Sequence, residues 1–297
     1  NYISWLSFSE IALIIRNCEI QTTQGHNMQP ITVRNTGLFI AIVSLLACGN
    51  SDTVESYYTH AERTTSFIQR DAYRHPNQTL SFFGIKKEHT VVEIWPGAGW
   101  YTEILAPYLK DSGKYYAAHF PKDSDISFFT RMRDKFDQKL TDSPTLYQNV
   151  TTTDFQPPNS VGIAPASSAD RVLTFRNVHN WMRNNSEQAA FNSFYKALKP
   201  GGILGVVEHR APDTFSIKDM IKTGYVSESY VKGLAKKSGF IFDASSEINA
   251  NLKDTKLHPE GVWTLPPSLR LGETNKTTYL NIGESDRMTL RFKKPFN

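Results

Sequence analysis

Residues 93–99 read EIWPGAG, so an acid, Glu93, is followed by two closely spaced glycines, Gly97 and Gly99. Such a turn between a strand and a helix can hold a nucleotide, because glycine lets the backbone approach the ligand and the helix N-terminus offers free N–H groups. Dinucleotide-binding loops carry a third glycine in the pattern G-x-G-x-x-G, which this segment lacks. The segment therefore predicts a nucleotide-binding loop and argues against NAD or FAD.

A second group of polar residues follows the apolar run DRVLTF. Ligands of open α/β sheets bind at the C-terminal ends of the strands, so these residues should face the site. His179 could act as a general base for an acceptor's proton, although a loop histidine can equally hold backbone groups. Asn180 and Trp181 could fix an acceptor or stack on it. We predict His179 and Asn180 as catalytic residues, and we place Arg176 and Asn177 beside a cofactor.

The later part of the chain adds two further features. Glu208, His209 and Arg210 end the run ILGVVEHR and should point toward the same rim of the sheet. Glu208 and Arg210 could take part in catalysis, but we expect them to pair with each other. The long segment 258–270, HPEGVWTLPPSLR, could cover a substrate, or it could be a hairpin crossover that packs on the sheet. The eight histidines show no H-x-x-x-H or H-x-H spacing, so we predict no metal site.

Apolar runs and helical spacings alternate along the chain from residue 90 onward. Short β-branched runs predict five strands, each followed by a helix, and then a helix capped by Ser227 and two further strands. Upstream, Pro76 interrupts a helical spacing, and Asn77 could cap a second short helix. Residues 251–285, with several prolines and glycines, predict irregular structure. The alternation implies a parallel sheet covered by helices on both faces.

The loop and strands resemble the class I S-adenosylmethionine-dependent methyltransferases. In their first motif an acid is followed by G-x-G-x-G, which Glu93, Gly97 and Gly99 match, whereas Trp95 stands at the first glycine. The segments ALKPGGILGVVEHR and SSADRVLTFRNVHNW resemble the part around their fifth strand and their fourth motif. The resemblance implies an α/β fold of the Rossmann-like methyltransferase class, with a mostly parallel seven-stranded sheet, helices on both faces and an antiparallel last strand.

The resemblance also implies methyl transfer from S-adenosylmethionine to an unidentified acceptor, either a small molecule or one associated with the cell envelope. The stretch from about Arg63 to Pro295 is similar to a family of exported bacterial proteins described as predicted methyltransferases. The segments that carry this likeness are RDAYRHP, VVEIWPGAGWYTEILAPYL, NVHNW, SEINANLKDTKLHPEGVWTLPP and IGESDRMTLRF. We therefore expect residues 63–297 to form a single methyltransferase-like domain.

The same resemblance assigns the contacts of the cofactor. An acid at the end of the second strand normally holds the ribose. Here the position is His119, which could accept only one hydrogen bond or could be an ordinary strand-end histidine. Asp154 loosely matches the acid on the adenine side, or it caps a loop, and Trp95 could stack on the ligand or fill the ligand's space. We predict as cofactor-binding residues Glu93, Trp95, Gly97, Gly99, His119, Asp154, Arg176 and Asn177.

The N-terminal part of the chain resembles a targeting sequence rather than part of the domain. We interpret residues 1–27 as non-native upstream sequence. Residues 28–48 end in Leu-Leu-Ala-Cys after an apolar run, which resembles a bacterial lipoprotein signal peptide; a plain secretory signal or an N-terminal hydrophobic helix is the alternative. A lipid on Cys48 would anchor the protein to a membrane of the bacterial cell envelope, facing the periplasm and with the outer membrane favoured. Residues 49–62 would then be a tether.

The composition limits the partners. The chain has 297 residues and a formal net charge of +4, and its basic residues are scattered, so we predict no nucleic-acid partner. The oligomeric state is not indicated. Because S-adenosylmethionine is made in the cytoplasm, export motivates a second hypothesis, a non-catalytic Rossmann-like protein that binds another ligand. Trp95 and His119 also favour this alternative.

Overall fold

The computed structural model describes residues 56–57 and 63–296. The predicted upstream sequence, the signal peptide with Cys48 and most of the tether lie outside the described residues. Tyr57, within the predicted tether, is buried: its N–H donates to Asn77 Oδ1 at 3.1 Å, and its ring centroid lies 4.8 Å from that of Tyr108. No helix in the described part of the chain is both long enough and apolar enough to span a bilayer.

Seven strands form the main sheet in the order β3-β2-β1-β4-β5-β8-β7, and an eighth, β6, pairs with β5. Their bounds are β1 (Thr90–Ile94), β2 (Lys114–His119), β3 (Val150–Asp154), β4 (Ala169–Phe175), β5 (Leu198–Ala211), β6 (Val226–Ser227), β7 (Ile241–Ser246) and β8 (Arg287–Lys293). Neighbours from β3 to β5 run parallel, whereas β8 is antiparallel to β5 and β7. The predicted sheet is therefore confirmed, and the C-terminal ends of β1 to β5 meet at one edge.

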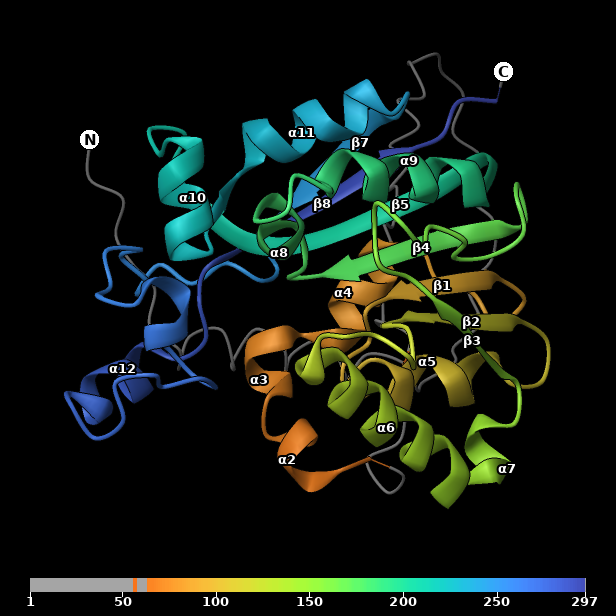
Figure 1. The fold of residues 1–297 in the computed structure, drawn as a ribbon, viewed down its shortest axis with the longest axis horizontal. Helices are drawn as coiled ribbons and strands as arrows, with labels where there is room; N and C mark the ends of the chain where they lie inside the picture. The colour runs from red at the N-terminus through yellow and green to blue at the C-terminus, as the bar shows by residue number, and fades with distance from the viewer. Residues whose placement is uncertain (1–55, 58–62, 297) are drawn as a thin grey trace, which may run out of the picture. The chain divides into compact units, whose positions relative to one another are not determined.

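Helices cover both faces of this sheet (Figure 1). Their bounds are α2 (Thr65–Ile68), α3 (Asp71–Arg74), α4 (Pro76–Phe82), α5 (Thr102–Leu109), α6 (Ser127–Asp142), α7 (Pro144–Tyr147), α8 (Val178–Met182), α9 (Glu187–Ala197), α10 (Ile217–Thr223), α11 (Glu228–Lys237), η2 (Gly261–Thr264) and α12 (Lys276–Ile282). Successive residues of β1 point to opposite faces, so Val92 joins a buried cluster with α8, α9 and α11, and Val91 joins one with α4, α5 and α6.

Local structure departs from the sequence prediction in three places. The alternation of strands and helices is interrupted after β3, because residues 155–168 form a loop that leads directly to β4. Residues 251–285 are not wholly irregular, because they contain η2 and α12. The predicted interruption is present between α3 and α4, but Asn77 does not cap the second helix. Pro76 is the first residue of α4 and His75 precedes it, because the first position of a helix needs no N–H group from proline. The predicted cap at Ser227 is confirmed: its Oγ accepts the N–H of Tyr230 at 3.3 Å at the start of α11.

Candidate functional site

The loop after β1 turns sharply, as its two glycines predict. Gly97 and Gly99 have φ values of 60° and 85°, in the left-handed region that favours glycine. Trp95 has a φ of 48° there despite its large side chain, which is uncommon for a non-glycine residue. A Cβ on Gly99 would lie 3.1 Å from Cδ of Lys139 on α6. The loop therefore requires glycine, and α6 packs closely against it.

Glu93 points into the layer between β1 and α5. Its buried carboxylate accepts hydrogen bonds from the Tyr115 hydroxyl and from Thr102 Oγ1, the latter at 3.2 Å. Thr102 is the first residue of α5, so this contact joins the helix to the sheet. Burial raises the pKa of Glu93 to about 7, although the two hydrogen bonds oppose the shift. The carboxylate thus positions the helix after the loop, and its contact with a cofactor stays a prediction.

Replacement of Glu93 by glutamine is expected to change the dependence of stability on pH. The folded pKa of about 7 exceeds the ordinary value of 4.5, so the wild type loses about 3 kcal/mol of stability as pH rises through this interval. Glutamine does not titrate. The unfolding free energy of Glu93→Gln relative to wild type should therefore rise by about 3 kcal/mol between roughly pH 4 and pH 8 in urea titrations. A difference that stays constant with pH would contradict the prediction.

The indole of Trp95 occupies the space between the ends of β2 and β3. Its Nε1 donates to the Phe155 carbonyl at 2.7 Å, and its ring centroid lies 4.7 Å from that of Phe120 and 5.3 Å from that of Trp181. Phe120 directly follows β2 and Phe155 directly follows β3. Trp95 therefore fills space in this structure. Trp181 is buried in the core, so it cannot stack on an acceptor in this conformation.

His119 and Asp154 both have partners within the chain. The buried ring of His119 accepts the Phe120 N–H at Nδ1, 2.7 Å away, which leaves Nε2 to donate to the Gly97 carbonyl at 2.9 Å. Burial lowers the pKa of His119 to about 4, so the ring is neutral. Asp154 accepts a hydrogen bond from Arg133 Nη1 at 2.7 Å. His119 could contact a ribose only by giving up one of its hydrogen bonds.

A cavity of about 250 Å³ opens at the C-terminal ends of β4 and β5. Arg176 and His179 reach it from the end of β4, and His209 reaches it from β5. Trp263, with two prolines of the same segment, forms one wall, so the predicted cover does lie over this cavity. The remaining charged residues of the wall are Arg70, Arg74 and Glu284.

A carboxylate from the neighbouring strand holds His179. Its Nδ1 lies 3.1 Å from Oε1 of Glu208, which is fully buried. One oxygen of Glu208 accepts the N–H of Val178 at 2.6 Å, and the other accepts the N–H of His209 at 2.8 Å. Because both oxygens of this carboxylate act as acceptors, Nδ1 of His179 carries a proton, and in the neutral imidazole Nε2 is then the nitrogen with the lone pair. This arrangement suits a general base.

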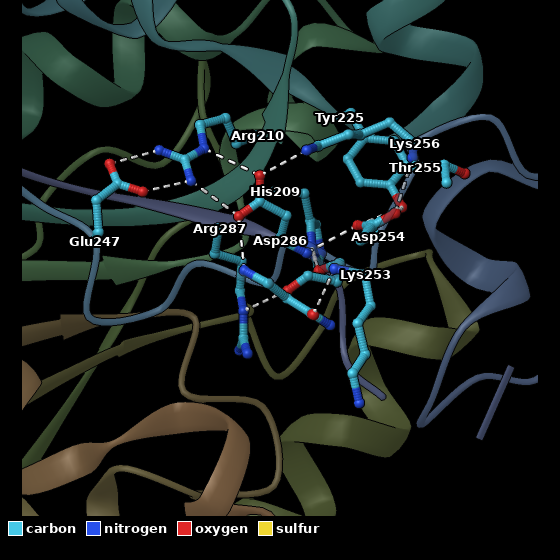
Figure 2. Close-up of polar contacts among 12 residues, drawn as sticks. His209, Arg210, Tyr225, Glu247, Lys253, Asp254, Thr255, Lys256, Asp286 and Arg287 are labelled. Atoms are coloured by element: carbon cyan, nitrogen blue, oxygen red, sulfur yellow. Dashed lines mark hydrogen bonds and ion pairs between the residues drawn. The ribbon is translucent and has the colours of Figure 1, made fainter. Parts of the chain in front are cut away.

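The predicted pair between Glu208 and Arg210 is wrong. Nη1 and Nη2 of Arg210 each lie 2.7 Å from a carboxylate oxygen of Glu247. Nη2 also lies 2.9 Å from Oδ1 of Asp286, and Figure 2 shows these contacts. Glu208 instead meets the first turn of α8, where Val178 offers a free N–H group. The N-terminus of a helix favours a carboxylate, which explains why Glu208 turns toward α8.

His179, Glu208 and His209 have ligand atoms within 4.8 Å of one another, so the group could hold a metal ion. The sequence predicts no metal site, because it offers no close spacing of histidines and these three come from two separate strand ends. The carboxylate oxygens of Glu208 already accept hydrogen bonds, and Nδ1 of His209 lies 2.5 Å from Ser285 Oγ. Burial lowers the pKa of His209 well below its ordinary value. Because the oxygens of Glu208 and Nδ1 of His209 already have partners within the chain, we assign Glu208 to the orientation of His179 rather than to a metal ion.

A network of acids joins the cover to β5 and to the segment before β8. Asp254 accepts the Tyr225 hydroxyl at 3.0 Å and the N–H of Asp286 at 2.8 Å. Asp286 in turn lies 2.9 Å from both Arg210 and Lys256. Figure 2 shows both contacts as dashed lines. Oδ1 of Asp254 also lies 2.8 Å from Nε2 of His258, the first residue of the cover, so these contacts fix the start of the cover beside the strand that carries His209.

Asn177 and Asn180 have different surroundings. Nδ2 of Asn177 donates to the Ile94 carbonyl at 2.9 Å and to Thr174 Oγ1 at 3.2 Å, which joins the ends of β1 and β4. The side chain of Asn180 forms no hydrogen bond with any residue that the structure describes, and it does not line the cavity. Asn177 is therefore a positioning residue in this structure, while the catalytic role of Asn180 stays a prediction.

Comparison with known proteins identifies the fold. No protein-family model matches the chain, and no curated protein matches its sequence. A Galdieria sulphuraria protein provisionally described as a sarcosine dimethylglycine methyltransferase matches the structure with a TM-score of 0.50 and 13% identity, over 82% of this chain and 94% of that chain. The [4+2]-cyclase SpnF matches with a TM-score of 0.50 and 14% identity, over 82% of this chain and 88% of that chain. The class I methyltransferase fold is thus confirmed, but SpnF is described as a cyclase, so the fold alone does not fix the reaction.

The residues at the loop fit an adenosyl cofactor only in part. The backbone of Gly97 and Gly99 and the start of α5 have the geometry of a nucleotide loop. The resemblance places the ribose at the end of β2 and the adenine near the end of β3, where the indole of Trp95 lies. The loop therefore fits the cofactor, whereas the indole of Trp95 lies where the resemblance places the adenine and must move before the adenosyl group can bind.

Proposed function

We propose that the chain is a methyltransferase that uses S-adenosylmethionine and acts on a small acceptor bound next to His179. The observation that carries this proposal is the His179–Glu208 pair beside a cavity at the C-terminal edge of a methyltransferase-fold sheet. Glu208 keeps the proton of His179 on Nδ1, so Nε2 can take the proton that an acceptor oxygen, nitrogen or sulfur loses on methylation. S-adenosylmethionine, when bound, supplies the methyl group.

The other residues of the site have supporting roles in this proposal. The cover that carries Trp263 keeps water from the cavity, and Asn177 holds the ends of β1 and β4 together beside it. Positioning of this kind is the main contribution that a protein makes to the transfer of a group between two bound molecules. The export family, the lipid on Cys48 and the periplasmic location stay proposals that rest on the sequence alone.

Calorimetric titration of the full chain with S-adenosylmethionine and S-adenosylhomocysteine tests the proposal. We expect both ligands to bind, and we expect release of S-adenosylhomocysteine from S-adenosylmethionine when a panel of small carboxylates, phosphate esters and amines is supplied. Because Trp95 must move, binding should be weak, with a dissociation constant of about 0.1–1 mM. A folded protein that gives no heat with millimolar ligand, with Trp95 present or replaced by glycine, would exclude this donor.

A further inference from the structure

Positive charge exceeds negative charge in the cavity beside His179. Arg70, Arg74 and Arg176 line it, and Glu284 is the one acid among its lining residues in the part of the chain that the structure describes. Glu284 lies 2.6 Å from Arg70 and 3.4 Å from Arg74. It also lies 3.1 Å from Arg287. Burial opposes ionisation of Glu284, but Arg74 and Arg287 hold its pKa at about 2, so its single charge is already shared by three guanidinium groups.

Arg176 has no counter-ion of its own. Its side chain forms no hydrogen bond and no ion pair with another described residue, and it is only partly exposed on the wall of the cavity. Burial and the nearby Arg287 lower the pKa of Arg176 to about 10, which still leaves it charged at neutral pH. Its φ of 61° is a left-handed conformation, and such strain in a non-glycine residue gathers at ligand sites. A charge withdrawn from water without a partner is unfavourable, and an anion would relieve it.

We propose that this cavity binds the acceptor through an anionic group, a carboxylate or a phosphate ester, which pairs with Arg176. This inference deepens the proposed function, because it names the substrate class for the site at His179. The planar guanidinium of arginine can donate two parallel hydrogen bonds to such a group. The acceptor's nucleophile would then lie on the His179 side of the same cavity.

The size and walls of the cavity narrow the acceptor further. A volume of about 250 Å³ is smaller than the roughly 300–1,000 Å³ of pockets for drug-sized ligands, so the ligand is small. Trp263 contributes aromatic surface to the wall, and the guanidinium groups of Arg183 and Arg270 lie 4.7 and 4.8 Å from its ring centroid and hold the indole in place. A compact acid with one ring or a short chain fits this combination of an arginine and an aromatic wall.

Titration with two probe anions, benzoate and inorganic phosphate, tests the inference. We expect at least one probe to bind the full chain, and Arg176→Met to weaken binding about tenfold or more. Arg131→Met is the matched control, because Arg131 is exposed on α6 and lies outside the cavity, and its affinity should equal that of wild type. If circular dichroism shows that Arg176→Met is unfolded, Arg176→Lys keeps the charge without the planar fork and should weaken binding by a smaller factor. No binding to wild type at about 50 mM, or equal binding by wild type and a folded Arg176 variant, would overturn the inference.

Competition separates the acceptor's anion from the carboxylate of the cofactor. If Arg176 binds the acceptor, S-adenosylhomocysteine and benzoate should bind together, each with unchanged affinity. Displacement of benzoate by S-adenosylhomocysteine would assign Arg176 to the cofactor and overturn the inference. Binding of benzoate that depends on Arg176, in a protein that binds no S-adenosylhomocysteine, would reject the proposed methyl donor while the anion site stands.

Discussion

The variant His179→Gln is expected to release S-adenosylhomocysteine about a hundred- to ten-thousand-fold more slowly than wild type, because glutamine cannot take up the acceptor's proton. The affinity for S-adenosylhomocysteine should be unchanged, since His179 belongs to the cavity and not to the loop. The rate of S-adenosylhomocysteine release is measured with the same panel of small carboxylates, phosphate esters and amines, and the affinity is measured by calorimetric titration. His89→Gln is the matched control, because His89 lies beside the start of β1, at the opposite edge of the sheet.

Glu208→Gln tests the orienting role in the same assay. An amide has one acceptor oxygen, whereas Glu208 accepts from the N–H groups of Val178 and His209 and from His179. The variant should lose about 1–3 kcal/mol of stability for each donor left unpaired. The variant should also release S-adenosylhomocysteine about a hundredfold more slowly, because the amide no longer keeps the proton of His179 on Nδ1 and the tautomer with the proton on Nε2 becomes populated. Release by His179→Gln within about threefold of wild type would remove the histidine from the mechanism.

The order of the elements could be predicted from the sequence because it depends on local patterns. The β-branched run TVVEI is the buried strand β1, and the two glycines after it do adopt left-handed conformations. Ser227 caps the start of α11 as its side chain predicts. Such signals lie within a few residues of one another, so one sequence is enough to read them.

The partners of the charged residues could not be predicted in the same way. Glu284 meets Arg70 and Arg74, which lie more than 200 residues earlier in the chain, and no local spacing links them. The sequence predicts that Glu208 pairs with Arg210, two positions away, but Glu208 instead accepts the N–H of Val178 at the start of α8. The part of the cavity lined by Arg70, Arg74 and Glu284 therefore forms only when the N-terminal helices pack beside the segment before β8.

The sequence is compatible with two roles for Trp95. A tryptophan at the first glycine of the motif could stack on a ligand or replace it, and the sequence contains nothing that decides between them. The structure favours replacement, because the indole makes a hydrogen bond to Phe155 and packs on Phe120, which follow the two strands that should hold the nucleoside. An adenosyl ligand bound as we propose would therefore compete with a side chain of the protein itself.

Trp95→Gly is expected to bind S-adenosylhomocysteine at least about tenfold more tightly than wild type. Removal of the indole clears the space beside Phe120 and Phe155, so the free energy of moving it no longer reduces the apparent affinity. Glycine also adopts the φ of 48° found at this position without strain. The same change should lower the unfolding free energy by about 3 kcal/mol, because a large, partly buried ring that packs against the core is lost.

Two controls distinguish cleared space from general loosening of the fold. Phe240→Ala removes a buried ring just before β7, away from the loop. Its unfolding free energy should fall by about as much as that of Trp95→Gly, without any gain in affinity for S-adenosylhomocysteine. Trp95→Phe keeps a ring among the aromatic side chains but loses the hydrogen bond to Phe155, so its affinity should lie between those of wild type and Trp95→Gly. Equal affinities of wild type and Trp95→Gly would show that the indole does not obstruct the nucleoside. A gain in Phe240→Ala as large as that in Trp95→Gly would attribute the effect to loosening alone.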